Sequence, residues 1–153
     1  MSVLRILIAD DHTLVRSGMR ALLQTEEDLE VVGEAATGEQ VVTMATTLQP
    51  DVIVMDLRMP GISGIEATRR ILHSNPAIRI LVVTLLEEDD TLFAALRAGA
   101  RGYVLKEASE VEVLRASVRW ARERPSSVRP WPSGWWGSFP PRDRPSLPCL
   151  SQI

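Results

Sequence analysis

The stretch DVIVMDLRMPGISGIEATRRI, residues 51–71, carries the pattern that decides the fold. It begins with the apolar run Val52–Met55, whose β-branched residues favour a strand that is covered on both faces. It leads into apolar residues at the 3.6-residue spacing of a helix, at Ile65, Ala67, Thr68, Ile71 and Leu72. A buried strand is therefore followed by an amphipathic helix, with Asp56 directly after the strand.

The same strand-then-helix pattern repeats on both sides of this stretch. Further apolar runs lie at Val3–Ala9, Glu30–Ala35, Ile80–Thr84 and Gly102–Leu105. Helical periodicity follows these runs, within residues 14–23, 41–48, 92–98 and 111–118. Five such units predict an α/β fold of (βα)5 type, a doubly wound parallel five-stranded sheet with right-handed crossovers.

Proline, glycine and serine mark the expected helix ends. Pro50 is expected to end the second helix, because a residue before proline is biased away from the helical conformation. Gly99 is expected just after the fourth helix, where a left-handed residue closes many helices. Ser109 is expected to cap the fifth helix, with Glu112 completing a capping box three residues later.

Length and composition are those of a globular chain. The 153 residues are 45% hydrophobic and carry a net charge of -3, so no global charge points to nucleic acid. The single cysteine, Cys149, excludes an internal disulfide framework. The chain shows no signal-peptide pattern and no apolar run long enough to cross a bilayer, so we expect a soluble cytoplasmic protein with no membrane association.

Five polar residues lie at the carboxyl ends of the predicted strands: Asp10, Asp11, Asp56, Thr84 and Lys106. Because ligands of doubly wound sheets bind at these strand ends, we expect one pocket to collect all five side chains. Three neighbouring carboxylates repel one another unless a cation lies between them, and Mg²⁺ prefers carboxylate, water and phosphate oxygens. A lysine and a threonine are suited to phosphoryl oxygens. The pocket is therefore predicted to bind Mg²⁺ and to stabilise a phosphoryl group on a carboxylate.

Four motifs make the chain from Val3 to about Ala121 resemble the receiver domain of two-component response regulators, which has a flavodoxin-like fold. They are IADDHTLVRSGMRALL at 8–23, the stretch at 51–71, LVVTL at 81–85 and ALRAGARGYVLKEAS at 95–109. The resemblance is closer to the regulators that carry a LuxR-type helix-turn-helix output domain, the NarL/FixJ group.

The resemblance implies a role for each residue of the predicted metal site. Asp56 corresponds to the phosphorylated aspartate. Asp11 corresponds to a direct ligand of Mg²⁺ and Asp10 to one that acts mainly through water. The backbone carbonyl of Arg58 corresponds to a further protein ligand.

Further matches imply phosphoryl binding and conformational switching. Thr84 corresponds to the switch hydroxyl, Lys106 to the lysine that pairs with the phosphate, and Tyr103 to the switch aromatic. Pro60 and Gly64 match the loop after the acceptor.

The activity implied by the resemblance is signalling. A sensor histidine kinase is expected to donate a phosphoryl group to Asp56 with Mg²⁺ bound, and the resulting switch is expected to control transcription through homodimerisation. DNA would be bound only through a C-terminal helix-turn-helix domain, which is missing from these 153 residues. The chain is not expected to be an enzyme, beyond catalysing its own phosphorylation and dephosphorylation.

Simpler explanations exist for single residues and for the whole pocket. Asp10 and Asp11 could cap the helix that begins near His12, and a histidine in that position is more often a surface residue than a metal ligand. The pocket could belong to a binding module that works without phosphorylation, which failure to bind Mg²⁺ would favour. It could also belong to an aspartyl-phosphate phosphatase or phosphotransferase, although such enzymes usually need a cap domain.

The chain divides into residues 1–122, the expected receiver domain, and residues 123–153, an irregular tail. The tail holds seven of the ten prolines and three of the four tryptophans, and it lacks a helical or strand period. It could be disordered, or a polyproline-like docking segment around Pro140 and Pro141. We favour a third hypothesis, that it is read from a shifted frame, because GC-rich codons read out of frame give such a composition.

Overall fold

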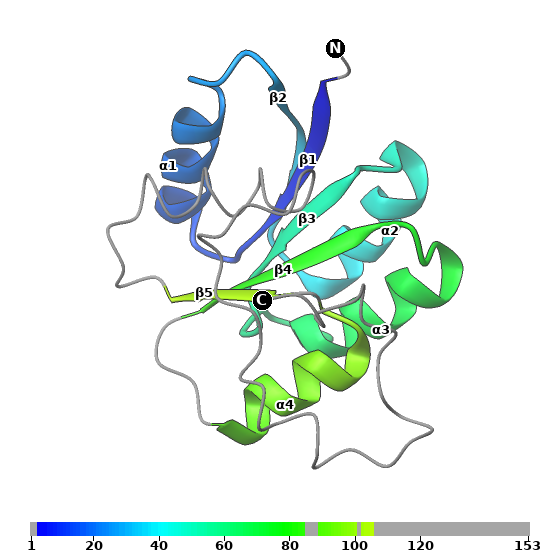
Figure 1. The fold of residues 1–153 in the computed structure, drawn as a ribbon. Helices are drawn as coiled ribbons and strands as arrows, with labels where there is room; N and C mark the ends of the chain where they lie inside the picture. The colour runs from blue at the N-terminus through cyan, green and yellow to red at the C-terminus, as the bar shows by residue number, and fades with distance from the viewer. Residues whose placement is uncertain (1–2, 85–88, 101, 106–153) are drawn as a thin grey trace, which may run out of the picture.

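The computed structural model describes residues 3–84, 89–100 and 102–105, which form a twisted parallel sheet flanked by helices (Figure 1). The strands are β1 (Leu4–Ala9), β2 (Leu29–Ala35), β3 (Val52–Met55), β4 (Arg79–Thr84) and β5 (Gly102–Leu105). They pair in parallel in the order β2-β1-β3-β4-β5. The predicted doubly wound sheet is confirmed, and every predicted strand boundary lies within one residue of the observed one.

Four helices follow the first four strands: α1 (Thr13–Leu23), α2 (Gly38–Leu48), α3 (Gly64–Ser74) and α4 (Asp89–Ala98). They confirm the four predicted helical patterns that fall within the described residues. The fifth pattern, its Ser109 cap and the tail lie outside the described residues. No helix in the described part of the chain is both long enough and apolar enough to span a membrane.

The predicted helix ends hold where the structure describes them. After α2, Gln49 takes a left-handed conformation directly before Pro50. After α4, Gly99 has a φ of 110°, and its N–H donates to the carbonyl of Leu96. The N–H of Ala100 donates to the carbonyl of Ala95, which completes a Schellman motif and satisfies carbonyls that the helix leaves open.

The helices cover the two faces of the sheet unequally. Helices α2, α3 and α4 pack on one face, and α1 packs on the other (Figure 1). Along β1, the side chain of Leu7 packs in the core beneath α2, α3 and α4, whereas those of Ile6 and Ile8 pack in the core beneath α1. Each of these side chains is fully buried, which stabilises the fold by about 1.5–3 kcal/mol per side chain. All four residues of β3 are buried, and burial on both faces explains why this strand is apolar throughout rather than alternating.

The register of the two central strands positions the candidate site. From β1 the chain continues to β2 on one side, whereas β3 lies on the other side, so the strand order reverses at β1 and β3. Ala9 is paired with Met55, and the N–H of Asp56 donates to the carbonyl of Ala9 at 2.9 Å. Asp10 and Asp56 therefore leave neighbouring strands at the same level of the sheet.

Candidate functional site

An acidic cluster lies at the carboxyl ends of β1 and β3. It contains Asp10, Asp11 and His12 from the β1–α1 turn and Asp56 from the end of β3, and one ligand atom from each residue lies within 4.8 Å of the others. Asp10 is fully buried and Asp56 is 6% exposed, whereas the Asp11 side chain is 31% exposed. The structure thus brings together the three carboxylates that the sequence places at two separate strand ends.

Backbone hydrogen bonds shape the turn that carries the acidic pair. The N–H of Asp10 donates to the carbonyl of Ala35 at 3.0 Å, and Asp10 Oδ1 accepts from the N–H of His12 at 2.9 Å. His12 stands at the N-cap of α1, and its side chain forms no capping bond. The capping explanation for Asp10 and Asp11 therefore does not hold, because neither residue occupies the N-cap.

The donor set of the cluster fits a hard divalent cation. Among the described residues, Asp11 Oδ1 is buried and accepts no hydrogen bond, although His12 Nδ1 lies 2.9 Å away. Leaving a buried carboxylate oxygen without a donor is costly, and a cation among the three carboxylates removes that cost. Oxygen ligands of this kind are those that Mg²⁺ prefers. His12 is 66% exposed, as expected for a surface residue, and its Nδ1 lies 3.2 Å from Asp10 Oδ1 and 2.9 Å from Asp11 Oδ1.

The loop after β3 holds Asp56 against the start of α3. Asp56 Oδ1 accepts from the N–H of Arg58 at 3.3 Å, and the N–H of Gly64 donates to the carbonyl of Leu57 at 3.1 Å. A Cβ atom at Gly64 would lie 2.3 Å from the backbone oxygen of Asp56. Ser63 caps α3, its hydroxyl accepting from the N–H of Glu66. The loop match that includes Gly64 thus has a steric reason, since only glycine lets the helix start this close to the acceptor.

The family described as the response regulator receiver domain matches residues 6–119. The chain belongs to this family. Response regulator GacA of Pseudomonas viridiflava is 46% identical over 114 residues, which cover 74% of this chain and 53% of that protein. The chain spans about half the length of the curated relatives it matches.

Solved structures agree with the sequence relatives. A LuxR-family two-component response regulator from Aurantimonas sp. SI85-9A1 is 39% identical, with a TM-score of 0.69 over 77% of this chain and 86% of that chain. The isolated receiver domain of RcsB from Salmonella enterica serovar Typhimurium, solved with the phosphomimetic BeF3-, is 30% identical, with a TM-score of 0.71 over 77% of this chain and 87% of that chain. The receiver fold and the resemblance to LuxR-type regulators are confirmed.

Of three further residues predicted for the site, the structure gives the strand positions of Thr84 and Tyr103 and does not describe Lys106. Thr84 is the last residue of β4 and is paired in register with Leu105 of β5. Tyr103 lies in β5 opposite Val82. Lys106 lies outside the described residues, directly after β5. The roles of these residues, and of the Arg58 carbonyl, stay predictions.

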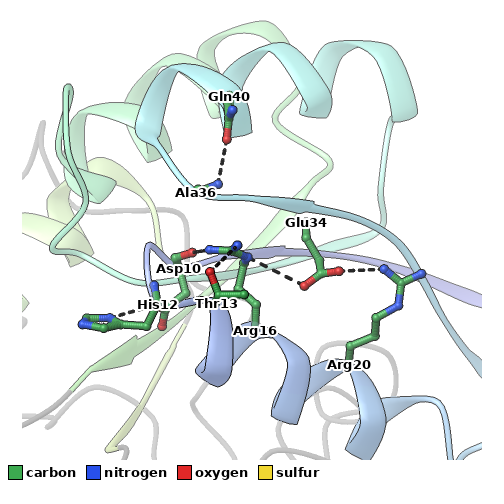
Figure 2. Close-up of polar contacts among 8 residues, drawn as sticks. All are labelled: Asp10, His12, Thr13, Arg16, Arg20, Glu34, Ala36 and Gln40. Atoms are coloured by element: carbon green, nitrogen blue, oxygen red, sulfur yellow. Dashed lines mark hydrogen bonds and ion pairs between the residues drawn. The ribbon is translucent and has the colours of Figure 1, made fainter.

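Two residues that support the receiver site were given no role from the sequence, although Arg16 lies within the motif at residues 8–23. Arg16 on α1 donates from Nη1 to the backbone oxygen of Asp10 at 2.5 Å (Figure 2). Glu39 on α2 accepts through Oε1 from the N–H of Ile62 at 3.1 Å. Both side chains bind a loop backbone, which any residue type offers, so the contact depends on where the helix lies and not on a motif.

Proposed function

We propose that this receiver domain accepts a phosphoryl group on Asp56 from a sensor histidine kinase, with Mg²⁺ held by Asp10, Asp11, Asp56 and the carbonyl oxygen of Arg58. The observation that carries the proposal is the gathering of three carboxylates within 4.8 Å, one of them with a buried oxygen that accepts no hydrogen bond from the described residues. The phosphomimetic in the solved receiver domain of RcsB supports the same chemistry for a relative.

Each carboxylate has its own part in the proposed transfer. An oxygen of Asp56 attacks the phosphorus of the kinase phosphohistidine, so that a P–O bond forms while the P–N bond breaks and its electrons stay on the imidazole. The bond from the Arg58 N–H to Asp56 Oδ1 orients the nucleophile. Asp10 and Asp11 hold the cation, which supplies charge neutralisation for the carboxylates and phosphoryl oxygens. The burial of Asp56 limits the access of bulk water to the product.

The proposed switch acts through the neighbouring edge of the sheet. The hydroxyl of Thr84 would bind one phosphoryl oxygen and the ammonium of Lys106 another, and Tyr103 would change its packing in response. Because β4 and β5 are adjacent, a change at Thr84 reaches Tyr103 across one strand pairing. The result is a population shift between two states, biased by a local change of charge.

The output is proposed for the longer protein of which such a domain forms part. Phosphorylation would favour homodimerisation, and a LuxR-type helix-turn-helix domain would bind DNA and regulate transcription. Within the receiver domain, catalysis would be limited to its own phosphorylation and dephosphorylation. This scheme requires the cytoplasmic compartment in which a kinase and DNA are both accessible.

Phosphorylation by a small donor tests the proposal. The chain is incubated with acetyl phosphate and Mg²⁺, and incorporation of one phosphoryl group is followed by intact-protein mass spectrometry. We expect Mg²⁺-dependent incorporation that is lost in Asp56→Asn and kept in Asp90→Asn, a matched change at an exposed aspartate on α4. Incorporation that persists in Asp56→Asn would refute the assignment.

Two rival functions give different results in the same preparation. A phosphorylation-independent binding module would bind neither Mg²⁺ nor beryllofluoride at the acidic cluster. A phosphatase or phosphotransferase would turn over a small phosphate ester repeatedly instead of stopping after one phosphoryl group per chain.

A further inference from the structure

Arg16 joins the acidic turn to the neighbouring strand. Its Nη1 donates to the backbone oxygen of Asp10 at 2.5 Å, and its Nη2 donates to Thr13 Oγ1 at 3.3 Å. Its side chain is only 15% exposed, although it comes from the first turns of a surface helix. Figure 2 shows the guanidinium lying between Asp10 and the carboxylate of Glu34. The guanidinium is therefore held from two sides, by the turn at Asp10 and by Glu34.

Glu34 holds the guanidinium from the side of β2. In the sheet, Glu34 is paired in register with Ile8, two residues before Asp10. Its Oε1 lies 3.7 Å from Arg16 Nε, and its Oε2 accepts from Arg20 Nη1 at 2.7 Å (Figure 2). Two arginines one helical turn apart thus share one carboxylate, and the bond to Asp10 comes from Arg16.

The oxygen that Arg16 binds belongs to the peptide between the two candidate metal ligands. A peptide unit is planar, so fixing its carbonyl oxygen fixes the direction in which the chain leaves Asp10 for Asp11. Asp10 is already tied through its N–H to Ala35 and through Oδ1 to His12. The bond from Arg16 adds the constraint on the side of Asp11. It uses a carbonyl oxygen, so it uses none of the carboxylate lone pairs that a cation needs.

We propose that Arg16, oriented by Glu34, is a positioning residue that fixes the Asp10–Asp11 peptide so that both carboxylates face the cation. Outer partners that orient metal ligands contribute to metal affinity without touching the metal. The inference rests on the proposed function, because it assumes that Asp10 and Asp11 hold Mg²⁺. Its specific consequence is that Arg16 governs the affinity for Mg²⁺ more than the rate of phosphorylation once Mg²⁺ is saturating.

The test compares Arg16→Gln with Arg20→Gln in the complete chain. Both changes remove one arginine from Glu34, but only the first removes the bond to the Asp10 carbonyl. The initial rate of phosphorylation by acetyl phosphate is measured against Mg²⁺ concentration, and Mg²⁺ binding is measured by calorimetry. We expect Arg16→Gln to raise the half-saturating Mg²⁺ concentration about tenfold with little change in the saturating rate, because outer-partner changes typically cost 10- to 100-fold in affinity. Arg20→Gln should leave both quantities unchanged.

A third variant separates positioning from a general loss of structure. Glu34→Gln should raise the half-saturating Mg²⁺ concentration less than Arg16→Gln does, and the double variant should match Arg16→Gln, since Glu34 acts through Arg16. Unfolding in EDTA gives the stability of each variant without the cation. If Arg16→Gln does not fold, the half-saturating Mg²⁺ concentration of Glu34→Gln is compared with that of Arg20→Gln, and only Glu34→Gln is expected to raise it.

The possible failures are distinguishable. Equal Mg²⁺ dependence of Arg16→Gln and Arg20→Gln overturns the positioning role, provided that Asp11→Asn weakens Mg²⁺ binding. Additive effects in the double variant also overturn it, because Glu34 would then act by another route. If Asp11→Asn leaves Mg²⁺ binding unchanged, the proposed metal site itself is wrong.

Discussion

The turn after β1 and the loop after β3 both bring carboxylates to the acidic cluster, but different interactions hold them. The turn, residues 10–12, is tied by a charged side chain, Arg16, that follows it in the next helix. The loop, residues 57–63, is tied to α2 by Glu39 and contains Gly61 in a left-handed conformation. It leads into α3 at Gly64, where a Cβ atom would clash with the backbone of Asp56 and Leu57. One connection depends on electrostatics and the other mainly on close packing.

This difference predicts how each connection responds to substitution. A side-chain hydrogen bond can be lost while the backbone keeps its path, so changes at the turn should affect cation binding more than stability. A backbone in contact with backbone cannot yield in that way, so changes at the loop should affect stability first.

The largest effect is expected for Gly64→Ala. The new Cβ atom would lie 2.3 Å from the backbone oxygen of Asp56 and 2.8 Å from Leu57 Cα, and neither atom belongs to a flexible side chain. We expect a loss of about 3 kcal/mol in the free energy of unfolding, at the upper end of typical overpacking costs. Urea denaturation measures this loss.

The matched control for that change is Gly18→Ala on α1. A Cβ atom at Gly18 meets nothing within 4 Å, so the substitution should stabilise the helix by about 0.5–1 kcal/mol. Equal effects of the two alanines would contradict the steric account of the loop.

A smaller loss is expected for Gly61→Ala, at about 1–2 kcal/mol for a left-handed residue with a side chain. Gly61 has a φ of 78°, and a Cβ atom there would lie 2.2 Å from Glu39 Oε2. In a Glu39→Ala background the contact with Glu39 disappears and the strain of the backbone remains. Unfolding free energies of the two single variants and the double variant should therefore not be additive. Strict additivity would show that the Glu39 contact does not matter.

Glu39→Ala alone should cost about 1 kcal/mol, the usual net contribution of one hydrogen bond. The lost bond is the one from the N–H of Ile62 to Glu39 Oε1 at 3.1 Å. Amide hydrogen exchange at Ile62 should accelerate in this variant, and it should stay unchanged in Glu30→Ala, a change at an exposed glutamate on β2. If amide exchange at Ile62 is unchanged in Glu39→Ala, the hydrogen bond from Glu39 does not hold the loop in place.

The smallest effect is expected for Arg20→Gln, at about 0.5 kcal/mol or less, because exposed ion pairs contribute little. Arg20 is 43% exposed, and without it Glu34 would still have the guanidinium of Arg16 as an ion-pair partner. The loss should shrink further in high salt, as measured by urea denaturation at two sodium chloride concentrations. If Arg20→Gln lowered the free energy of unfolding as much as Gly64→Ala does, the turn and the loop would not differ in their effect on stability.

Local patterns predicted the elements of the fold well. The runs Val52–Met55 and Gly102–Leu105 agree with β3 and β5 residue for residue. All four residues of β3 are buried, and a strand that is covered on both faces is apolar at successive positions. Gly99 was predictable as a helix end because a left-handed residue has a clear preference for glycine. The helix caps Thr37 and Ser63 were not predicted, although serine and threonine before a helical pattern are a local signal.

The candidate site was predictable in its carboxylates and not in its supports. Asp10, Asp11 and Asp56 stand at strand ends, and parallel strands bring their carboxyl ends to one edge, so their meeting follows from the fold class. The contact of Glu39 with Ile62 joins residues 23 positions apart and depends on how α2 packs beside the loop. The position of Arg16 over Asp10 depends in the same way on how α1 lies across β1 and β2.

The sequence by itself determined the alternation of strands and helices and the residue types at the strand ends, because hydrophobic period and residue chemistry are local properties. Only the tertiary structure decided the register that sets Ala9 beside Met55, the burial of Asp11 Oδ1 and the two different ways in which the flanking connections are held. These features arise from packing between different segments of the chain. The partner is often a backbone oxygen or N–H, which every residue except proline offers in the same form, so the sequence does not indicate which one is bound.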